Sequence, residues 1–255
     1  MLNLERIQTN LNTRYIGRSI LPFDELDSTN SQALRLHRSN ITNGLVIVTD
    51  KQTGGRGRRG NNWHSTPGKS LTFSVIIFPD VPLINSGLLS LLAGVAVAET
   101  MEKYDIEAKL KWPNDIIIFD KKIGGLLCET RVVQNQVDTF VIGIGLNINE
   151  DRIDFPETIV NSATSVKIIL NKIVQRESVL IHLLSQLETW IDHIENKDKI
   201  ISTWLARCAH LEQVISIKIK GNTVSGIFSG LTDYGEAIIE TNGKETIISA
   251  GIVTI

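Results

Sequence analysis

Residues 52–63 read QTGGRGRRGNNW, and the fold of the chain depends on what surrounds this glycine-rich stretch. Its centre, GRGRRG, matches the G-x-G-x-x-G pattern that binds the pyrophosphate of dinucleotides in Rossmann folds. That pattern needs a strand before it and a helix directly after it. The strand is present at 44–50 (GLVIVTD), but the following residues, NNWHSTPGKSLTFSV, contain a proline and a glycine and then alternate as a strand does. A nicotinamide-dependent Rossmann fold is therefore excluded.

Three arginines in this stretch, Arg56, Arg58 and Arg59, form the only tight basic cluster of a chain whose net charge is −2. Glycine lets the backbone approach a ligand closely, and guanidinium groups bind carboxylate and phosphate oxygens in pairs. The stretch therefore predicts a site for a ligand with several anionic oxygens. A solvated basic turn is the alternative that charge alone leaves open. The overall charge argues against general nucleic-acid binding by bulk electrostatics.

The segments on either side predict an α+β fold. Strand-like runs occur at 14–27, 44–50, 69–79, 109–132 and 138–149. The fourth of these runs reads as three strands of an antiparallel meander. Residues 86–104 and 177–195 predict long helices, and a shorter helix begins near DSTN (27–30), with Thr29 as its expected N-cap. Together these elements predict a mixed, largely antiparallel sheet packed with helices.

The pattern changes near Leu211. The residues from there onward form five short strand-like runs separated by turn signals, and Asn242-Gly243 is a strong hairpin signal. Since no helical pattern interrupts these runs, they predict a small SH3-like β-barrel. We therefore expect two domains, a main domain at 1–210 and the barrel at 211–255.

Composition indicates the general class of protein. The 255 residues are 42% hydrophobic and 21% charged, which is ordinary for a globular protein. No apolar run approaches the roughly 20 residues of a membrane span, and the first residues do not read as a signal peptide. We expect a cytoplasmic protein that does not bind a membrane. Cys128 and Cys208 lack metal or redox spacing and are expected to be buried and reduced.

Five segments taken together resemble the biotin protein ligase family. They are DSTN (27–30), QTGGRGRRGNNW (52–63), KWPND (111–115), KKIGGLLCE (121–129) and GIGLNIN (143–149). The resemblance implies the class II synthetase-like catalytic fold of biotin and lipoate ligases in the main domain, followed by the C-terminal barrel. Only about 20 residues precede the first matched strand, too few for the roughly 60-residue DNA-binding domain of some members. We therefore expect the short form, which does not bind DNA.

The resemblance also implies an ATP-dependent ligase reaction. Biotin is activated with ATP and Mg²⁺ to biotinyl-5′-AMP, and the biotinyl group is then transferred to a lysine of a biotin carboxyl carrier protein. Dimerisation is a further expectation from the family. The glycine-rich residues 53–66 are expected to be mobile without ligand and to close over the intermediate.

The family pattern implies a role for particular residues. For biotin binding it implies Ser28, Thr29, Asn30, Gln52, Gly55, Arg56, Gly57, Arg58 and Lys122. For ATP binding it implies Arg58, Arg59, Trp63, Lys111, Asn114 and Asn147. The implied catalytic residues are Lys122, Arg58, Asp115 and Lys111, and Asp115 is also the expected Mg²⁺ ligand.

Each of these assignments has a structural alternative in the sequence. DSTN could be a plain helix cap, Asp115 could belong to an Asx-turn, and the GIG at 143–145 could serve close strand packing. Two other functions also remain open. A lipoate or octanoate ligase shares the fold but must hold a long apolar acyl chain, and a non-catalytic biotin-binding regulator would not need Arg58, Asp115 and Lys122 together.

Overall fold

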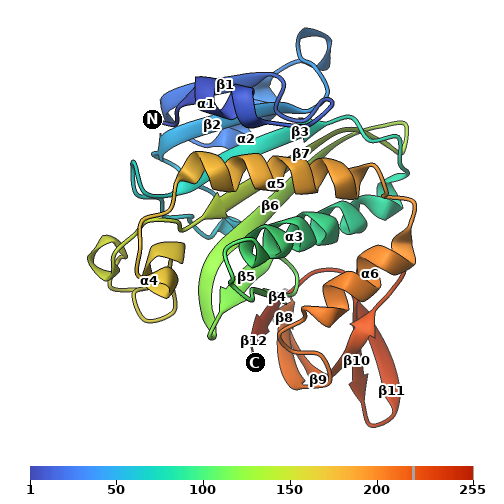
Figure 1. The fold of residues 1–255 in the computed structure, drawn as a ribbon. Coiled ribbons are helices and arrows are strands. Elements are labelled where there is room, and N and C mark those ends of the chain that lie inside the picture. The colour runs from blue at the N-terminus through green and yellow to red at the C-terminus, as the bar shows by residue number, and fades with distance from the viewer. Residues whose placement is uncertain (220–221, 255) are drawn as a thin grey trace.

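The chain folds into a central sheet covered by helices and a smaller sheet at its C-terminal end (Figure 1). The computed structural model describes residues 1–219 and 222–254. The central sheet has the strand order β1-β2-β3-β7-β6-β5-β4. Its strands are β1 (Ile20–Leu26), β2 (Leu45–Gln52), β3 (Leu71–Ile77), β4 (Lys109–Lys111), β5 (Asp115–Ile118), β6 (Lys121–Val133) and β7 (Gln136–Leu146). Strands β1 and β2 pair in parallel and the other neighbours pair antiparallel, which confirms the predicted mixed, largely antiparallel sheet.

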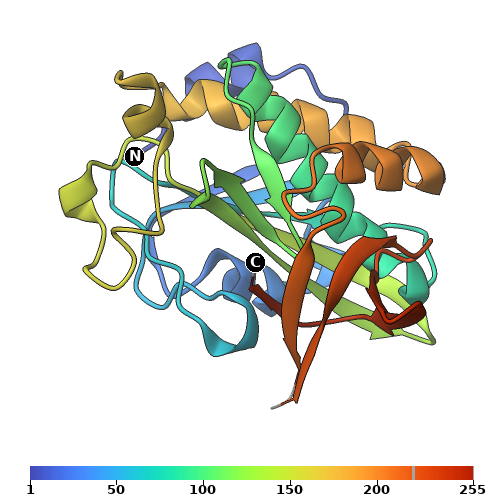
Figure 2. The same ribbon diagram turned by 90° about the horizontal axis from the view of Figure 1, so that it is seen from below.

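Helices pack on both faces of the central sheet (Figures 1 and 2). They are α1 (Leu4–Asn10), α2 (Thr29–Arg35), α3 (Ser86–Glu102), α4 (Val166–Leu170), α5 (Arg176–Ile191) and α6 (Lys197–Ala206). Strand β2 shows the consequence, because Val46 and Val48 join the core that contains α3, whereas Leu45 and Ile47 pack in a second core with Ala33 of α2. Burial on both faces explains why this strand is apolar without alternation.

Leu83–Glu102, which includes helix α3, has the length and composition of a membrane span, so the expectation that no apolar run approaches this length was wrong. In the fold this helix is enclosed by strands β4–β7 and by helices α5 and α6. The side chains of Leu88, Leu92 and Val95 have no exposed surface. A helix that is covered all round needs no polar face, so α3 is a core helix of this fold.

The second sheet lies where the sequence predicts the C-terminal strands, and its order is β11-β10-β9-β8-β12. Its strands are β8 (Val214–Ile219), β9 (Asn222–Leu231), β10 (Ala237–Thr241), β11 (Lys244–Ile248) and β12 (Ile252–Thr254). Asn242 and Gly243 both have positive φ, at 52° and 73°, as the predicted hairpin turn requires. This sheet is joined to the main body by α6, which packs on β9, and by the hydrogen bond from Trp112 Nε1 to the Gly235 carbonyl (3.2 Å). The division into domains at residues 210 and 211 stays a prediction.

Some local predictions were wrong. Strand β1 begins at Ile20 rather than at residue 14, because Gly17 with φ +75° breaks the extended backbone. The N-cap of α2 is Ser28 rather than Thr29, since Ser28 is extended and its side chain accepts a hydrogen bond from the Ser31 amide. Helices α4 and α6 were not predicted. Cys128 and Cys208 are free, as expected, but only partly buried.

Candidate active site

One cavity collects residues from separate parts of the chain. They come from the start of α2, from β2 and β3, and from residues 53–70 that join these two strands (the glycine loop). Others come from residues 109–133 that form β4–β6 (the meander), and from β7 and β12. Figure 2 shows the C-terminal end beside the glycine loop. The residues that the sequence predicts for the site and that line this cavity are Ser28, Thr29, Asn30, Gln52, Arg56, Gly57, Arg58, Arg59, Trp63, Lys111, Asn114, Asp115 and Lys122.

Two of the predicted residues do not line the cavity. Gly55 is buried behind it, where a Cβ atom would lie 2.4 Å from the Trp63 carbonyl oxygen, so its role is to let the two limbs of the loop meet. Asn147 is buried, and its Nδ2 donates to the Thr164 carbonyl at 2.9 Å. The structure thus places Asn147 in the protein framework rather than on the cavity surface.

One end of the cavity presents neutral polar groups. Gln52 lines the cavity, and its Oε1 accepts from the Thr29 amide (2.9 Å). Both donors of Asn30 are used within the protein: its Nδ2 donates to the Leu127 carbonyl and to Glu129, each at 2.8 Å, and its Oδ1 accepts from Ser74 at 2.6 Å. Asn30 therefore has no free donor for a ligand, and only its Oδ1 could accept a further hydrogen bond.

The glycine loop folds back on itself as an irregular hairpin. The Gly57 amide donates to the Asn61 carbonyl (2.7 Å), and the Trp63 amide donates to the Gly55 carbonyl (2.9 Å). Arg59 at the tip has φ 55°, and its Nη1 donates to the Lys218 carbonyl in β8 (2.9 Å). The loop is followed by β3 rather than by a long helix, which confirms that it is not a Rossmann turn.

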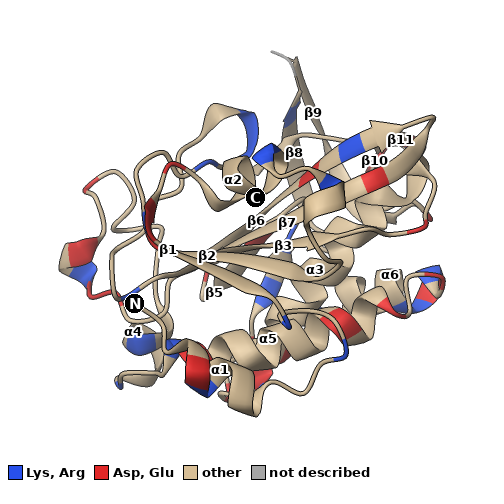
Figure 3. Cartoon of the chain, turned by 90° about the horizontal axis from the view of Figure 1, so that it is seen from above, with Lys and Arg blue, Asp and Glu red and all other residues tan. Residues whose placement is uncertain are grey.

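Positive charge exceeds negative charge among the side chains that line the cavity. Five cations line the cavity, Arg56, Arg58, Arg59, Lys111 and Lys122, together with a single carboxylate, Asp115. Elsewhere the two signs are interspersed, as along α5 and α6 in Figure 3. A chain of net charge −2 has therefore gathered cations at one place, which favours an anionic ligand there.

The five cations differ in how they are paired. Arg56 Nη2 binds Glu129 (2.6 Å) and Lys122 Nζ binds Asp115 Oδ1 (2.6 Å). Within residues 1–219 and 222–254, Arg58 and Lys111 have no ion-pair partner. Burial lowers the pKa of the Arg58 guanidinium, although arginine keeps its charge. An anionic ligand would compensate these two charges.

The meander gives the site a rigid floor. Lys111 and Asp115 are paired across the β4–β5 turn, and Asn114 in that turn exchanges hydrogen bonds with Leu126 of β6 (2.8 and 2.9 Å). Gly125 faces Lys122, whose Nζ would lie 3.2 Å from a Cβ at that position. The glycine thus leaves room for the lysine beside Asp115.

Two glycines of β7 make room for cavity side chains, a role that the sequence did not reveal. A Cβ at Gly143 would lie 2.1 Å from Asn30 Oδ1, and a Cβ at Gly145 would lie 2.4 Å from the Trp63 ring. The alternative of close packing at GIG is therefore correct, but the groups that pack there are cavity residues. The sequence predicted a strand at β12, but not that its Ile252 and Val253 line the cavity.

Cys128 has no role in this arrangement. Burial raises the pKa of its thiol to about 11, so the thiol stays protonated near neutral pH and is a poor nucleophile.

The fold and the cavity define the class of protein: an α+β protein whose cavity combines neutral polar side chains with five cations. A family model described as "Biotin/lipoate A/B protein ligase family" matches residues 23–147, and one described as "Biotin protein ligase C terminal domain" matches residues 210–254. The chain belongs to the biotin protein ligase family.

Individual relatives agree with this assignment. The bifunctional ligase/repressor BirA of Bacillus subtilis is 34% identical over 98% of this chain and 78% of its own length. The biotin–[acetyl-CoA-carboxylase] ligase of Mycobacterium tuberculosis is 31% identical over 89% of this chain and 85% of its own length. Among solved structures, the biotin protein ligase from Aquifex aeolicus in complex with biotin and ATP superposes with a TM-score of 0.77, at 29% identity, over 93% of this chain and 98% of the other.

Proposed function

We propose that the chain is a biotin protein ligase, which activates biotin with ATP and transfers the biotinyl group to a lysine of a biotin carboxyl carrier protein. The observation that supports this proposal most is the cavity. It combines neutral polar side chains, among them Gln52, with cations that include Lys122 of the Lys122–Asp115 pair. The family supports this reading, since one relative is named a bifunctional ligase/repressor and another a biotin–[acetyl-CoA-carboxylase] ligase.

The first step joins two anions, so it depends on cations. A carboxylate oxygen of biotin attacks the α-phosphorus of ATP, the new C–O–P linkage forms, and the bond to the β-phosphate breaks to release pyrophosphate. Lys122, Arg58 and Lys111 would neutralise charge where it accumulates on the phosphate oxygens. Lys122 is the central cation of the proposal, because it is fixed beside Asp115.

The second step releases AMP. The amine of the carrier lysine attacks the carbonyl carbon of the mixed anhydride, an amide bond forms, the C–O bond to the phosphate breaks, and the nitrogen loses a proton. Protection of the anhydride from water requires a cover over the cavity. We propose that the glycine loop is this cover, with Arg58 and Trp63 facing the intermediate.

The described residues fit Mg²⁺ only as an ion that arrives with ATP. Within residues 1–219 and 222–254 no group of three or more His, Cys, Asp or Glu side chains is arranged to hold a metal ion. Asp115 offers one carboxylate oxygen beside the one that binds Lys122, and Mg²⁺ commonly uses one or two carboxylates together with substrate phosphates. When bound, the ion would neutralise phosphate charge.

The other expectations remain proposals. The name of the Bacillus relative includes a repressor function, and we do not propose that function for this chain. The two free cysteines suit the reducing cytoplasm. We propose no membrane partner, and dimerisation rests on the family alone.

The test is incubation of the purified protein with ATP, Mg²⁺, biotin and a biotin-carrier domain, with the carrier mass as the readout. We expect a biotin-sized mass gain on one lysine, and its loss in Lys122→Ala. A parallel reaction with lipoate in place of biotin distinguishes a biotin ligase from a lipoate ligase. A gain with lipoate only would replace the proposal by a lipoate ligase, and no gain with either would favour a non-catalytic binding protein.

A further inference from the structure

Arg176, the first residue of α5, is buried although it is charged. Its side chain is 10% exposed, and its Nη1 donates to Asp50 Oδ1 (2.9 Å) and to the Ser70 carbonyl (2.8 Å). A cation in the first turn of a helix is opposed by the helix dipole, and burial of a charge is costly. Helix formation alone therefore does not explain an arginine at this position.

The two partners of Arg176 stand at opposite ends of the glycine loop. Asp50 lies in β2, just before the loop begins, and Ser70 is the last residue of the loop. A single guanidinium thus joins the chain entering the loop to the chain leaving it. The pairing of β2 with β3, whose last pair is Thr49 and Thr72, brings the loop ends close, and the Arg176 bridge lies just beyond that pair. No side chain of the loop itself belongs to the hydrophobic core, so this bridge is an added restraint on the loop ends.

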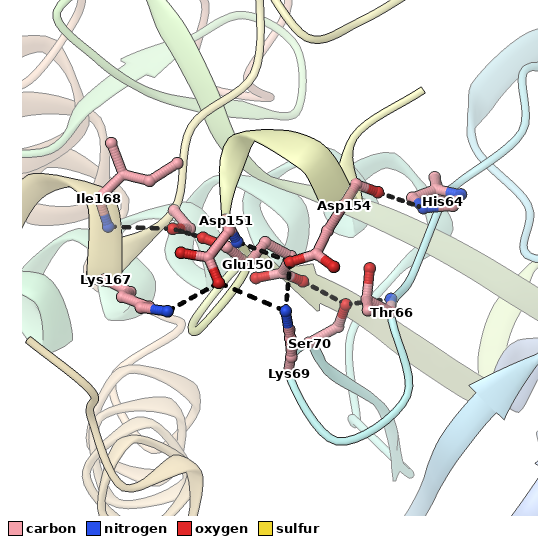
Figure 4. A network of polar contacts seen from close by, with 10 residues as sticks. His64, Thr66, Lys69, Ser70, Glu150, Asp151, Asp154, Lys167 and Ile168 are labelled. Carbon is pink, nitrogen blue, oxygen red and sulfur yellow. Dashed lines mark hydrogen bonds and ion pairs between the residues drawn. The ribbon is translucent and has the colours of Figure 1, made fainter. Parts of the chain in front are cut away.

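A second set of contacts holds the outgoing limb of the loop to the segment that follows β7 (Figure 4). Ser70 Oγ accepts from the Thr66 amide (2.7 Å) and donates to the buried carboxylate of Glu150. Lys69 Nζ binds Asp154 (2.5 Å), and His64 Nε2 lies 3.1 Å from the Asp154 carbonyl oxygen. The outgoing limb, from the residue after Trp63 onward, is therefore fastened from outside the cavity.

We infer that Arg176 is a positioning residue of the ligase site, which holds the two ends of the glycine loop together so that Arg58 and Trp63 lie over the reaction intermediate. Glu150 supports the same limb through Ser70. The inference rests on the proposed function. The bridge from Arg176 to Asp50 and Ser70, here called the clamp, can be tested without it. Neither residue lines the cavity, so both act through the loop.

The loop provides its own readout, because trypsin cleaves after arginine and the tip contains Arg56, Arg58 and Arg59. We expect native-state cleavage at these sites to be about tenfold faster in Arg176→Met than in the wild type, as loss of a charge-assisted bond predicts. Arg176→Lys keeps the positive charge but loses the planar guanidinium group that donates to two partners at once. Its cleavage rate should therefore lie between those of the wild type and Arg176→Met. The matched control is Arg207→Met, which breaks a partly buried ion pair between Arg207, at the C-terminal end of α6, and Glu102 of α3.

The control should change cleavage at the loop by less than about twofold, because the side chain of Arg207 binds Glu99, Glu102 and the Thr203 carbonyl and no residue of the loop. If Arg176→Met is folded by circular dichroism and its loop is cleaved no faster than that of Arg207→Met, the clamp is wrong. Should Arg176→Met fail to fold, Asp50→Asn decides the matter, since it keeps an oxygen acceptor and removes only the charge. We expect faster cleavage in this variant too, and unchanged cleavage overturns the inference.

The consequence for the reaction is measured as AMP released per biotin transferred to the carrier. The wild type should be tightly coupled, whereas Arg176→Met should release several-fold more AMP because the intermediate escapes or hydrolyses. A general loss of stability would lower both products without changing their ratio. An unchanged ratio in an Arg176→Met variant with a loosened loop would remove the positioning role. If the wild type transfers no biotin, the proposed function fails, while the cleavage comparison still decides the clamp.

Discussion

The glycine loop and the meander face each other across the cavity and are built in opposite ways. The meander is paired along β4, β5 and β6, and it buries Ile116, Ile118 and Ile123 in the main core. The loop has a few hydrogen bonds between its own limbs and is fastened mainly at its ends. Its cations are unpaired or bound to groups outside the loop, whereas Lys122 of the meander is fixed to Asp115.

This difference indicates a division of labour. Local opening of a protein requires least free energy where few apolar contacts are lost, so the loop can open and close while the meander keeps its geometry. The meander would hold the group around which bonds change, and the loop would supply charge and cover. Mutations on the two sides should then affect different quantities, namely the rate of activation on one side and retention of the intermediate on the other.

The largest effect should follow from loss of the central cation in the meander. Lys122→Gln should slow AMP formation in a single turnover by about a thousandfold, close to 4 kcal/mol of the barrier. The control is Lys109→Gln, because Lys109 lies in the same meander but pairs with the exposed Glu107. A loss smaller than that of Arg58→Gly would reverse the proposed division of labour.

The next effect concerns the support behind the meander. His210 has no exposed surface, and its ring lies 4.5 Å from that of Phe228. Burial, and secondarily the charge of Lys111, lowers the pKa of His210 from 6.5 to about 4. Folding therefore favours the neutral ring, and this stabilisation is complete above pH 6.5 and is lost as the pH falls from 6.5 to 4.

The lost free energy of unfolding amounts to about 3 kcal/mol at pH 4. His210→Phe should remove this part of the acid destabilisation, which urea unfolding at pH 7 and at pH 4 would measure. His193→Gln, at an exposed histidine, serves as the control and should leave the slope unchanged. Equal pH slopes for wild type and His210→Phe would show that the ring stays accessible to protons.

A smaller effect is expected from the loop side. Arg58→Gly should weaken retention of the adenylate by about 2 kcal/mol and leave Lys122 and Asp115 in place. The released intermediate should then label lysines of an unrelated protein such as serum albumin, which mass spectrometry would detect. Arg58→Lys keeps the charge and should release less. Selective labelling of the carrier alone by Arg58→Gly would contradict the covering role of the loop.

The smallest effect is expected where the loop meets the sheet. Gly145→Ala would bring a Cβ against the Trp63 ring, and since Trp63 lies in a loop that can shift, we expect a loss of about 1 kcal/mol in ATP binding. Calorimetric titration would measure it, and Trp63→Leu in the same chain should restore part of the loss. Gly94→Ala is the control, because its nearest neighbour is 3.5 Å away and alanine favours the helix.

The sequence predicted the elements whose signal is local. The apolar β2, the long helix α3, the three strands of the meander and the Asn242-Gly243 turn each follow from periodicity or turn chemistry within a few residues. The choice against a Rossmann fold also rested on neighbouring residues. The short helices α4 and α6 were not predicted, because a few turns of helix contain too few residues to show a periodic apolar pattern.

Parts of the site could not be predicted because their partners lie far away in the chain. Arg176 meets Asp50 and Ser70 across more than one hundred residues, and no spacing rule connects them. Asn30 and Asn147 show a second limit of prediction from sequence, which is that hydrogen bonds within the protein cannot be foreseen. Their residue types fit ligand binding, but only coordinates show that the side chains already bind Leu127, Glu129 and Thr164.

The position of β12 has a consequence for the synthesis of the protein. Ser28 and Val253 line the same cavity, so the site brings together residues from near both ends of the described chain. A ribosome must therefore release nearly all of these residues before the cavity can close. A chain that stops before Gly251 lacks one side of the cavity, so an unfinished chain would lack the enclosure needed to retain a reactive acyl adenylate.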